Sequence, residues 1–116
     1  MATRDTLFAD IDTMDPDRFA AHLADDAVMR FGNAEPVRGR AAIRDAWAGF
    51  CETVDGVEHE VVEQWQPAGA TIVESNVTYT RKDGGRVTVP VVTIYREVGG
   101  LIADYRVFID LAPLFA

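Results

Sequence analysis

The stretch LIADYRVFIDLAPLF, residues 101–115, decides how the fold of this chain is interpreted. Most of it consists of aromatic and β-branched residues, which is typical of a strand. One carboxylate, Asp110, stands near its end, with Ile109 before it and Leu111 after it. An aspartate in that position either faces solvent at the end of the strand or points into a pocket around which the domain is built.

The composition indicates one globular domain spanning residues 1–116. Hydrophobic residues make up 48% of the chain and charged residues 26%, the balance of an ordinary soluble protein. The formal net charge of -8 argues against binding to nucleic acid or to anionic membranes, since both require basic patches. No apolar run approaches the roughly 18 residues needed to cross a bilayer.

The N-terminal residues, the cysteine count and the lack of known binding motifs limit the class of protein further. The N-terminal residues lack the apolar core of a secretory signal, and Cys51 is the single cysteine, so we expect no internal disulfide and a cytoplasmic location. The two histidines do not have metal-ligand spacing with nearby acids, and no nucleotide-binding fingerprint is present. We therefore expect neither a metal nor a cofactor.

Periodicity predicts three short helices in the first half of the chain. The first covers about residues 4–13, the second begins at Asp15-Pro16 and ends at Asp25-Asp26, and the third begins at about Arg40. A short strand at residues 27–31 lies between the second and third helices. His22, on the second helix, is predicted to face solvent.

The second half of the chain predicts a meander of four long strands, at residues 57–65, 71–81, 86–97 and from 101 onward. Pro90 in the third of them predicts a bulge or a locally unpaired position. Helices followed by consecutive antiparallel strands indicate an α+β domain. The helices are then available to cover the concave face of one strongly twisted sheet, which would enclose an apolar interior.

Four segments carry a resemblance to a known family. They are FAAHLADDAVMRFGN (19–33), VRGRAAIRDAW (37–47), VEHEVVEQW (57–65) and DYRVFIDLAPLF (104–115). In order and spacing the chain resembles the SnoaL-like polyketide cyclase group of the nuclear transport factor 2-like, or ketosteroid isomerase-like, superfamily. The resemblance implies a cone-shaped, mixed or antiparallel sheet covered on its concave face by three N-terminal helices, a cystatin-like roll. It does not select an activity, because the superfamily includes isomerases, cyclases, dehydratases, epoxide hydrolases and binding modules.

Limonene epoxide hydrolase-like members offer one chemical comparison. Their last strand also ends in an aspartate followed by leucine, so Asp110 is similar to one of their catalytic acids. The arginine and aspartate that complete their relay should fall on the strand 74–80, which here reads ESNVTYT. Their absence argues against epoxide hydrolysis by that mechanism, although Asn76 and Thr78 could hold a water or a substrate oxygen.

Asp110 is the first candidate for a catalytic residue. Alternation places it on one strand face with Arg106 and Phe108, and places Tyr105 and Val107 on the other. If the Asp110 face is concave, the carboxylate lies in an apolar cavity and can act as a general acid or base. The alternative is that Asp110 caps the strand end or pairs with Arg106, which would otherwise be an oxyanion partner.

His59 is the second catalytic candidate, because strand alternation puts it on the apolar side with Val57, Val61 and Trp65. It is an acid–base partner if it lies near Asp110, and otherwise a core or pocket-wall residue. The remaining candidates for contact with a substrate are aromatic walls and hydrogen-bonding groups, for which ordinary core packing is the alternative. They are Phe19, Trp47, Trp65, Tyr79, Phe108, Asn76, Thr78 and Arg106.

Three functions remain open at this stage. The first is a cofactor-free isomerase, cyclase, lyase or hydrolase that moves a proton on a small apolar molecule. The second is a non-catalytic module that binds such a molecule. The third is an association domain, since an apolar stripe of Tyr105, Val107 and Ile109 on the outer sheet face would favour a homodimer.

Overall fold

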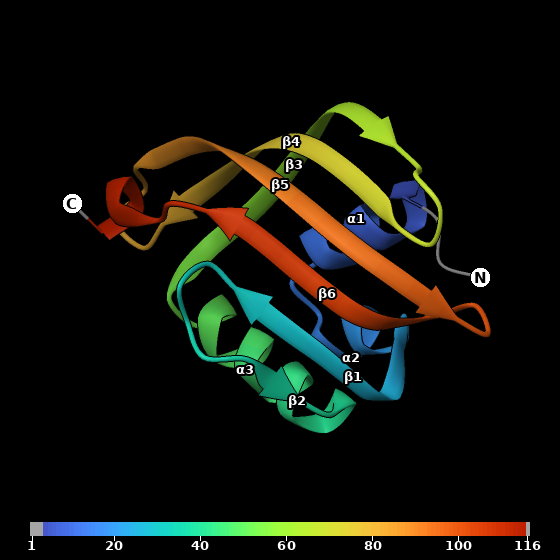
Figure 1. Cartoon of the computed structure of the whole chain (residues 1–116). Coiled ribbons are helices and arrows are strands. Elements are labelled where there is room, and N and C mark those ends of the chain that lie inside the picture. Colours follow the sequence, from blue (N-terminus) through green and yellow to red (C-terminus); the bar gives the residue numbers. More distant parts are fainter. Residues whose placement is uncertain (1–3, 116) are drawn as a thin grey trace.

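The computed structural model describes residues 4–115 and consists of one curved sheet with helices on one side of it (Figure 1). The helices are α1 (Arg4–Asp12), α2 (Pro16–Ala20), α3 (Arg40–Cys51) and the 3-10 turn η1 (Ala112–Phe115). The strands are β1 (Leu23–Phe31), β2 (Val37–Arg38), β3 (Val54–Trp65), β4 (Thr71–Arg81), β5 (Arg86–Val98) and β6 (Leu101–Ile109). No helix in the described part of the chain is long and apolar enough to cross a membrane.

The sheet is mixed, with the strand order β2-β1-β6-β5-β4-β3. Strands β3 to β6 form the predicted antiparallel meander, and β1 lies parallel to β6. The α+β class, the curved sheet and the three covering helices are therefore confirmed. The short strand predicted at residues 27–31 is longer than expected, because β1 begins at Leu23.

The second helix is shorter than predicted, and this corrects two placements. Asp15 caps α2 through its carboxylate, which accepts a hydrogen bond of 2.9 Å from the Asp17 N–H. The helix ends at Ala20, so Asp25 and Asp26 lie in β1, within an irregular segment between Leu23 and Val28. His22 is also no longer helical, and it is buried rather than solvent-facing.

Pro90 does not produce a bulge. It pairs in register with Asn76 of β4, and it lies one residue beyond the part of β5 that pairs with β6, which starts at Val91. One side of the backbone at Pro90 thus has no strand partner, where a missing N–H is harmless. The register shifts of the sheet lie elsewhere, between Val61 and Glu63 of β3 among other places.

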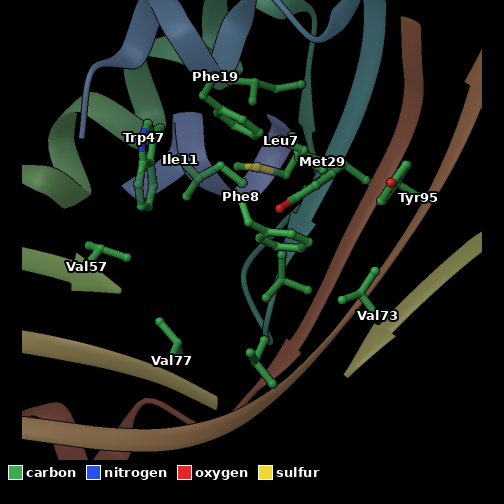
Figure 2. Packing of buried hydrophobic residues seen from close by; sticks show 14 of the residues in the cluster. Leu7, Phe8, Ile11, Phe19, Met29, Trp47, Val57, Val73, Val77 and Tyr95 are labelled. Atoms are coloured by element: carbon green, nitrogen blue, oxygen red, sulfur yellow. The ribbon is translucent and has the colours of Figure 1, made fainter. Parts of the chain in front are cut away.

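The core lies between the helices and the inner face of the sheet (Figure 2). Side chains from α1, α2 and α3, such as Leu7, Phe19 and Ile43, meet inward residues of the strands, such as Val73 and Val77. Alternation is regular along β4, where every second residue from Thr71 to Tyr79 is buried. The inner face of the sheet is therefore the main apolar surface that folding removes from water.

Two adjacent residues at the start of β6 test this packing. Ile102 is fully buried and Leu101 is 39% exposed. We expect Ile102→Ala to lower the free energy of unfolding by about 2–5 kcal/mol, because it removes apolar contacts and leaves a cavity. Leu101→Ala should change it by only about 0.5 kcal/mol. Urea denaturation of both variants measures the difference, and equal losses would contradict the burial pattern.

Candidate functional site

A cavity of about 180 Å³ lies between the helices and the inner sheet face. Six aromatic side chains contribute to its walls, together with aliphatic residues and three polar residues. The aromatic lining residues are Phe19, Phe31, Trp47, Phe50, Tyr79 and Tyr105; the polar ones are Glu35, His59 and Thr93. No lysine or arginine lines the cavity among the described residues.

Helix α3 supplies one wall of the cavity through two stacked rings. Trp47 and Phe50 are three residues apart and therefore point to the same side of the helix. Their ring centroids are 5.5 Å apart with an interplanar angle of 15°. Tyr79 of β4 meets Phe50 edge to face at 5.5 Å, so the helix wall and the sheet are in direct aromatic contact.

His59 is held at the edge of this cavity by Asp12, the last residue of α1. The His59 Nδ1 atom lies 2.6 Å from Asp12 Oδ1, and the backbone N–H of His59 donates to Asp12 Oδ2 at 2.8 Å. The ring also packs against Phe8 at 4.9 Å between centroids. The exposed fractions of the two side chains are only 10% for His59 and 23% for Asp12.

The contact with Asp12 determines which ring nitrogen of His59 is free. An ionised carboxylate only accepts hydrogen bonds, so Nδ1 must carry the proton that is shared with Asp12. In the neutral ring Nε2 then holds a lone pair, and no side chain within residues 6–115 forms a hydrogen bond with it. The pair thus leaves one basic nitrogen without a side-chain partner on a residue that lines an apolar cavity.

Two tyrosines of the cavity are held in the neutral, hydrogen-donating form. Burial raises the pKa of Tyr79 well above its usual range, and the negative charge of Asp12 raises it further. Burial likewise raises the pKa of Tyr105. The Trp47 Nε1 atom is buried without a hydrogen-bond partner among the described residues. These groups make the cavity a place with hydrogen-bond donors and no fixed positive charge.

The structure brings together four of the predicted site residues, since His59, Phe19, Trp47 and Tyr79 all line the cavity. Asp110 does not. Its side chain is exposed, and Oδ1 accepts a 2.9 Å hydrogen bond from the Ala112 N–H, which caps η1. The placement of Asp110 in an apolar pocket is therefore wrong, and the alternative of a cap at the strand end is correct.

The two residues of β6 that were predicted to contact a substrate also lie on the outer face of the sheet. Arg106 and Phe108 are exposed, and Arg106 Nε lies 3.3 Å from Asp104 Oδ2 rather than pairing with Asp110. Tyr105 and Val107, expected on the outer face, instead line the cavity. The physical reason is charge. The alternating residues that include Asp104, Arg106 and Asp110 face outward because water solvates their charges there.

Three further residues predicted at the pocket lie outside it. Asn76 and Thr78 are half-buried on the outer face of β4, where Thr78 Oγ1 lies 2.8 Å from Thr88 Oγ1. Trp65 is 44% exposed. The register shift between Val61 and Glu63 reverses the alternation of β3, so Trp65 points away from the side on which His59 lies.

Asp12 is a residue of the candidate site that the sequence does not reveal. It lies 47 positions before His59, and nothing in its neighbourhood distinguishes it from Asp10 or Asp15. Asp10 in fact forms the second such pair, 2.7 Å from His22 Nε2. No group of three or more metal-ligating side chains is gathered anywhere in the described residues.

Known proteins can be compared with this site. A family model described as SnoaL-like domain matches residues 5–105. No curated protein sequence matches the chain.

Solved structures share the fold at low sequence identity. A hypothetical protein of ketosteroid isomerase-like fold from Catenulispora acidiphila, crystallised in complex with trimethylamine, is 16% identical with a TM-score of 0.85 over 93% of this chain and 85% of that one. An LEH-like epoxide hydrolase from M. tuberculosis is 20% identical, with a TM-score of 0.80 over 96% and 82%. A putative SnoaL-like polyketide cyclase from Jannaschia sp. CCS1 is 18% identical, with a TM-score of 0.76 over 90% and 91%. With the family match covering most of its length, the chain belongs to the SnoaL-like family, within the nuclear transport factor 2-like, or ketosteroid isomerase-like, fold.

Proposed function

We propose that this protein is a cofactor-independent enzyme that moves a proton on a small, neutral, apolar molecule. His59 is the general base, and Asp12 is a positioning residue that fixes its tautomer. The observation that carries the proposal is the pair of hydrogen bonds from His59 to one carboxylate, which leaves Nε2 available at an aromatic cavity. Asp110 has no part in this proposal, because it lies outside the cavity.

The lining of the cavity supports a neutral substrate. A permanently charged anion is best buried beside a cationic partner, and the described lining contains neither lysine nor arginine. Asp12 and Glu35 would in addition repel a negative charge. A neutral carbonyl compound has no such penalty, and its oxygen can accept a hydrogen bond from a tyrosine hydroxyl.

The volume of the cavity favours a molecule with a single ring. An apolar protein cavity of about 150 Å³ is known to hold benzene. The cavity of this protein, at about 180 Å³, is only slightly larger. A monocyclic ketone or enone therefore fits the enclosed space, whereas a tetracyclic polyketide or steroid would extend beyond it.

The proposed chemical step balances without a cofactor. His59 Nε2 takes a proton from the carbon next to the carbonyl group, so an N–H bond forms as the C–H bond breaks. The electron pair of the C–H bond forms the enolate double bond, and the negative charge moves to oxygen, where a neutral Tyr79 hydroxyl can donate a hydrogen bond. The imidazolium, stabilised by Asp12, then returns the proton, which is the common step of an isomerase, a cyclase or a lyase.

Hydrogen–deuterium exchange tests this proposal with cyclohex-2-enone as the probe. We expect the wild-type protein to accelerate exchange of the proton next to the carbonyl in D₂O, measured by NMR. His59→Gln should lower the rate by about 10²–10⁴-fold, the usual contribution of a general base. Asp12→Asn should lower it by at least about tenfold, because an amide can stabilise the wrong tautomer. Asp110→Asn is the matched control and should keep the wild-type rate.

The same experiment separates the enzyme from a binding module. If cyclohex-2-enone shifts the NMR signals of cavity residues but exchanges no faster than in buffer, the protein binds without catalysis and the proposal fails. An unchanged exchange rate in His59→Gln would equally remove His59 as the base. Loss of exchange in Asp110→Asn would indicate that Asp110 is needed for proton transfer, which would contradict the proposal.

A second prediction concerns the two tyrosines of the cavity. Their pKa values are raised in the folded protein, so the neutral phenols are favoured by folding. The two tyrosines should therefore make their full contribution to the free energy of unfolding below pH 10, which is about the pKa of a tyrosine in the unfolded chain. This contribution should fall as the pH rises above 10. Thermal denaturation between pH 8 and pH 11 measures this loss. Tyr79→Phe should reduce the loss, and a melting temperature independent of pH above 10 would contradict the prediction.

A further inference from the structure

The aromatic walls of the cavity surround its interior rather than cover one side of it. Trp47 and Phe50 of α3 lie nearly parallel, whereas Phe19 of α2 meets Trp47 at 66°. Tyr79 of β4 meets Phe50 at 71°, with 5.5 Å between the ring centroids. The complete series of contacting rings is Phe31, Phe50, Trp47, Phe19 and Tyr105, with Tyr79 against Phe50. Because these rings face in several directions, a molecule inside the cavity meets aromatic surface on several sides.

The fixed charges at the cavity are negative. The described lining contains neither lysine nor arginine, and the neutral form of His59 carries no charge. Burial raises the pKa of Tyr79, and the negative charge of Asp12, which contacts His59, raises it further. The charge of Asp12 therefore acts on groups inside the cavity. Glu35 adds a second carboxylate to the lining itself, so the cavity attracts positive charge.

Glu35 lies where the cavity opens to solvent. The exposed lining residues are Ala34, Glu35 and Ala46. Ala34 and Glu35 belong to the loop between β1 and β2, and Ala46 belongs to α3, so the opening lies between this loop and the helix. Glu35 forms no ion pair with any side chain of residues 6–115. Its charge at the opening is thus available to a ligand.

We propose that the cavity also binds a small quaternary ammonium ion, whose methyl groups contact the aromatic rings and whose positive charge is balanced by the carboxylates of Glu35 and Asp12. The faces of aromatic rings attract cations, and several rings around one site are suited to an alkylated ammonium group. This binding goes beyond the proposed proton transfer, since it requires neither a carbonyl group nor His59 as a base.

The lining selects an alkylated cation over a metal ion or a primary amine. A metal ion or a primary ammonium group binds water strongly, and the apolar walls offer few groups that could replace this water. The methyl groups of a quaternary ammonium ion need no hydrogen bonds. The cavity volume of about 180 Å³ also suits a compact ion, since a protein cavity of about 150 Å³ holds one benzene ring.

Choline and 3,3-dimethylbutan-1-ol test this proposal, because the two molecules have the same shape and differ in one positive charge. A cavity without electrostatic preference would favour the alcohol, since a cation loses more hydration on burial. We expect choline to bind at least about tenfold more tightly, because the contacts with the rings and carboxylates outweigh this loss. Chemical-shift titration by NMR measures both dissociation constants. Equal affinities, or tighter binding of the alcohol, would overturn the proposal.

An aromatic variant tests the contribution of the rings. Phe31→Leu keeps an apolar side chain at the wall but removes its aromatic face, so it should weaken choline binding by at least about twofold. Binding of 3,3-dimethylbutan-1-ol should change less than choline binding does. Phe108→Leu is the matched control, because Phe108 is exposed on the outer face of the sheet, and it should bind choline as the wild type does.

A charge variant tests the carboxylate at the opening. Glu35→Gln should weaken choline binding by about twofold to fivefold, the usual effect of one solvent-exposed ionic contact, and should leave the alcohol unaffected. Glu63→Gln is the matched control, because Glu63 is exposed and pairs with Glu74 on the outer face of the sheet. NMR spectra verify that each variant is folded. Unchanged choline affinity in both Phe31→Leu and Glu35→Gln would place the ion outside the cavity and contradict the proposal.

Competition with cyclohex-2-enone separates this proposal from the proposed enzyme activity. Choline should inhibit the exchange reaction competitively, because both molecules occupy one cavity. Choline binding without any exchange activity would support the ammonium site and remove the enzyme proposal alone. Exchange activity in a protein that does not bind choline would remove the ammonium site alone.

Discussion

The contact between Asp12 and His59 joins the first helix to the sheet and fixes the position of one residue that lines the cavity. Asp12 is the last residue of α1, and its carboxylate accepts both the ring and the backbone N–H of His59. Asp10, half a turn earlier, is paired with His22 on the opposite side of the helix. Both histidines of the chain thus contact carboxylates of one short helix. A nine-residue helix is marginal by itself, so these contacts and the burial of Leu7, Phe8 and Ile11 hold it over the apolar interior.

The same contact fixes the tautomer of His59 on which the proposed chemistry depends. A histidine in an apolar wall with no partner would be an ordinary core residue, able to adopt either tautomer. Fixing the proton on Nδ1 leaves the other nitrogen as an acceptor in a region where water is largely excluded, which strengthens its interaction with a substrate proton. The buried tyrosines complement it, because their raised pKa values keep them as donors. The proposed base therefore arises from the contact with Asp12 and the proposed donors from burial.

The sequence was sufficient for the fold because local signals agreed with it. Proline and aspartate marked the start of α2, glycine marked the hairpin turns, and alternation marked the strands. Helical periodicity places Phe19 and Trp47 correctly, and strand alternation places His59 and Tyr79 correctly. Trp65 was misplaced because a register shift reverses the face of β3 within four residues, and such a shift has no reliable sequence signal. Asp12 was missed because its partner is brought to it by tertiary packing across 47 positions.

Strand β6 shows why the placement of Asp110 could have been anticipated. Its residues alternate between an aromatic and aliphatic set, Tyr105 and Val107, and a charged set, Asp104 and Arg106, whose parity Asp110 continues just beyond the strand. Solvation assigns the charged set to the outer face, whereas the family resemblance favoured a carboxylate in the pocket. Because successive side chains of a strand point to opposite faces of the sheet, assigning the charged set to the outer face also assigns the apolar set to the inner face. The strand that lines the cavity with Tyr105 must present Arg106 and Phe108 to the outside, so a single alternation determines both the inner wall of the proposed active site and the outer surface of the sheet.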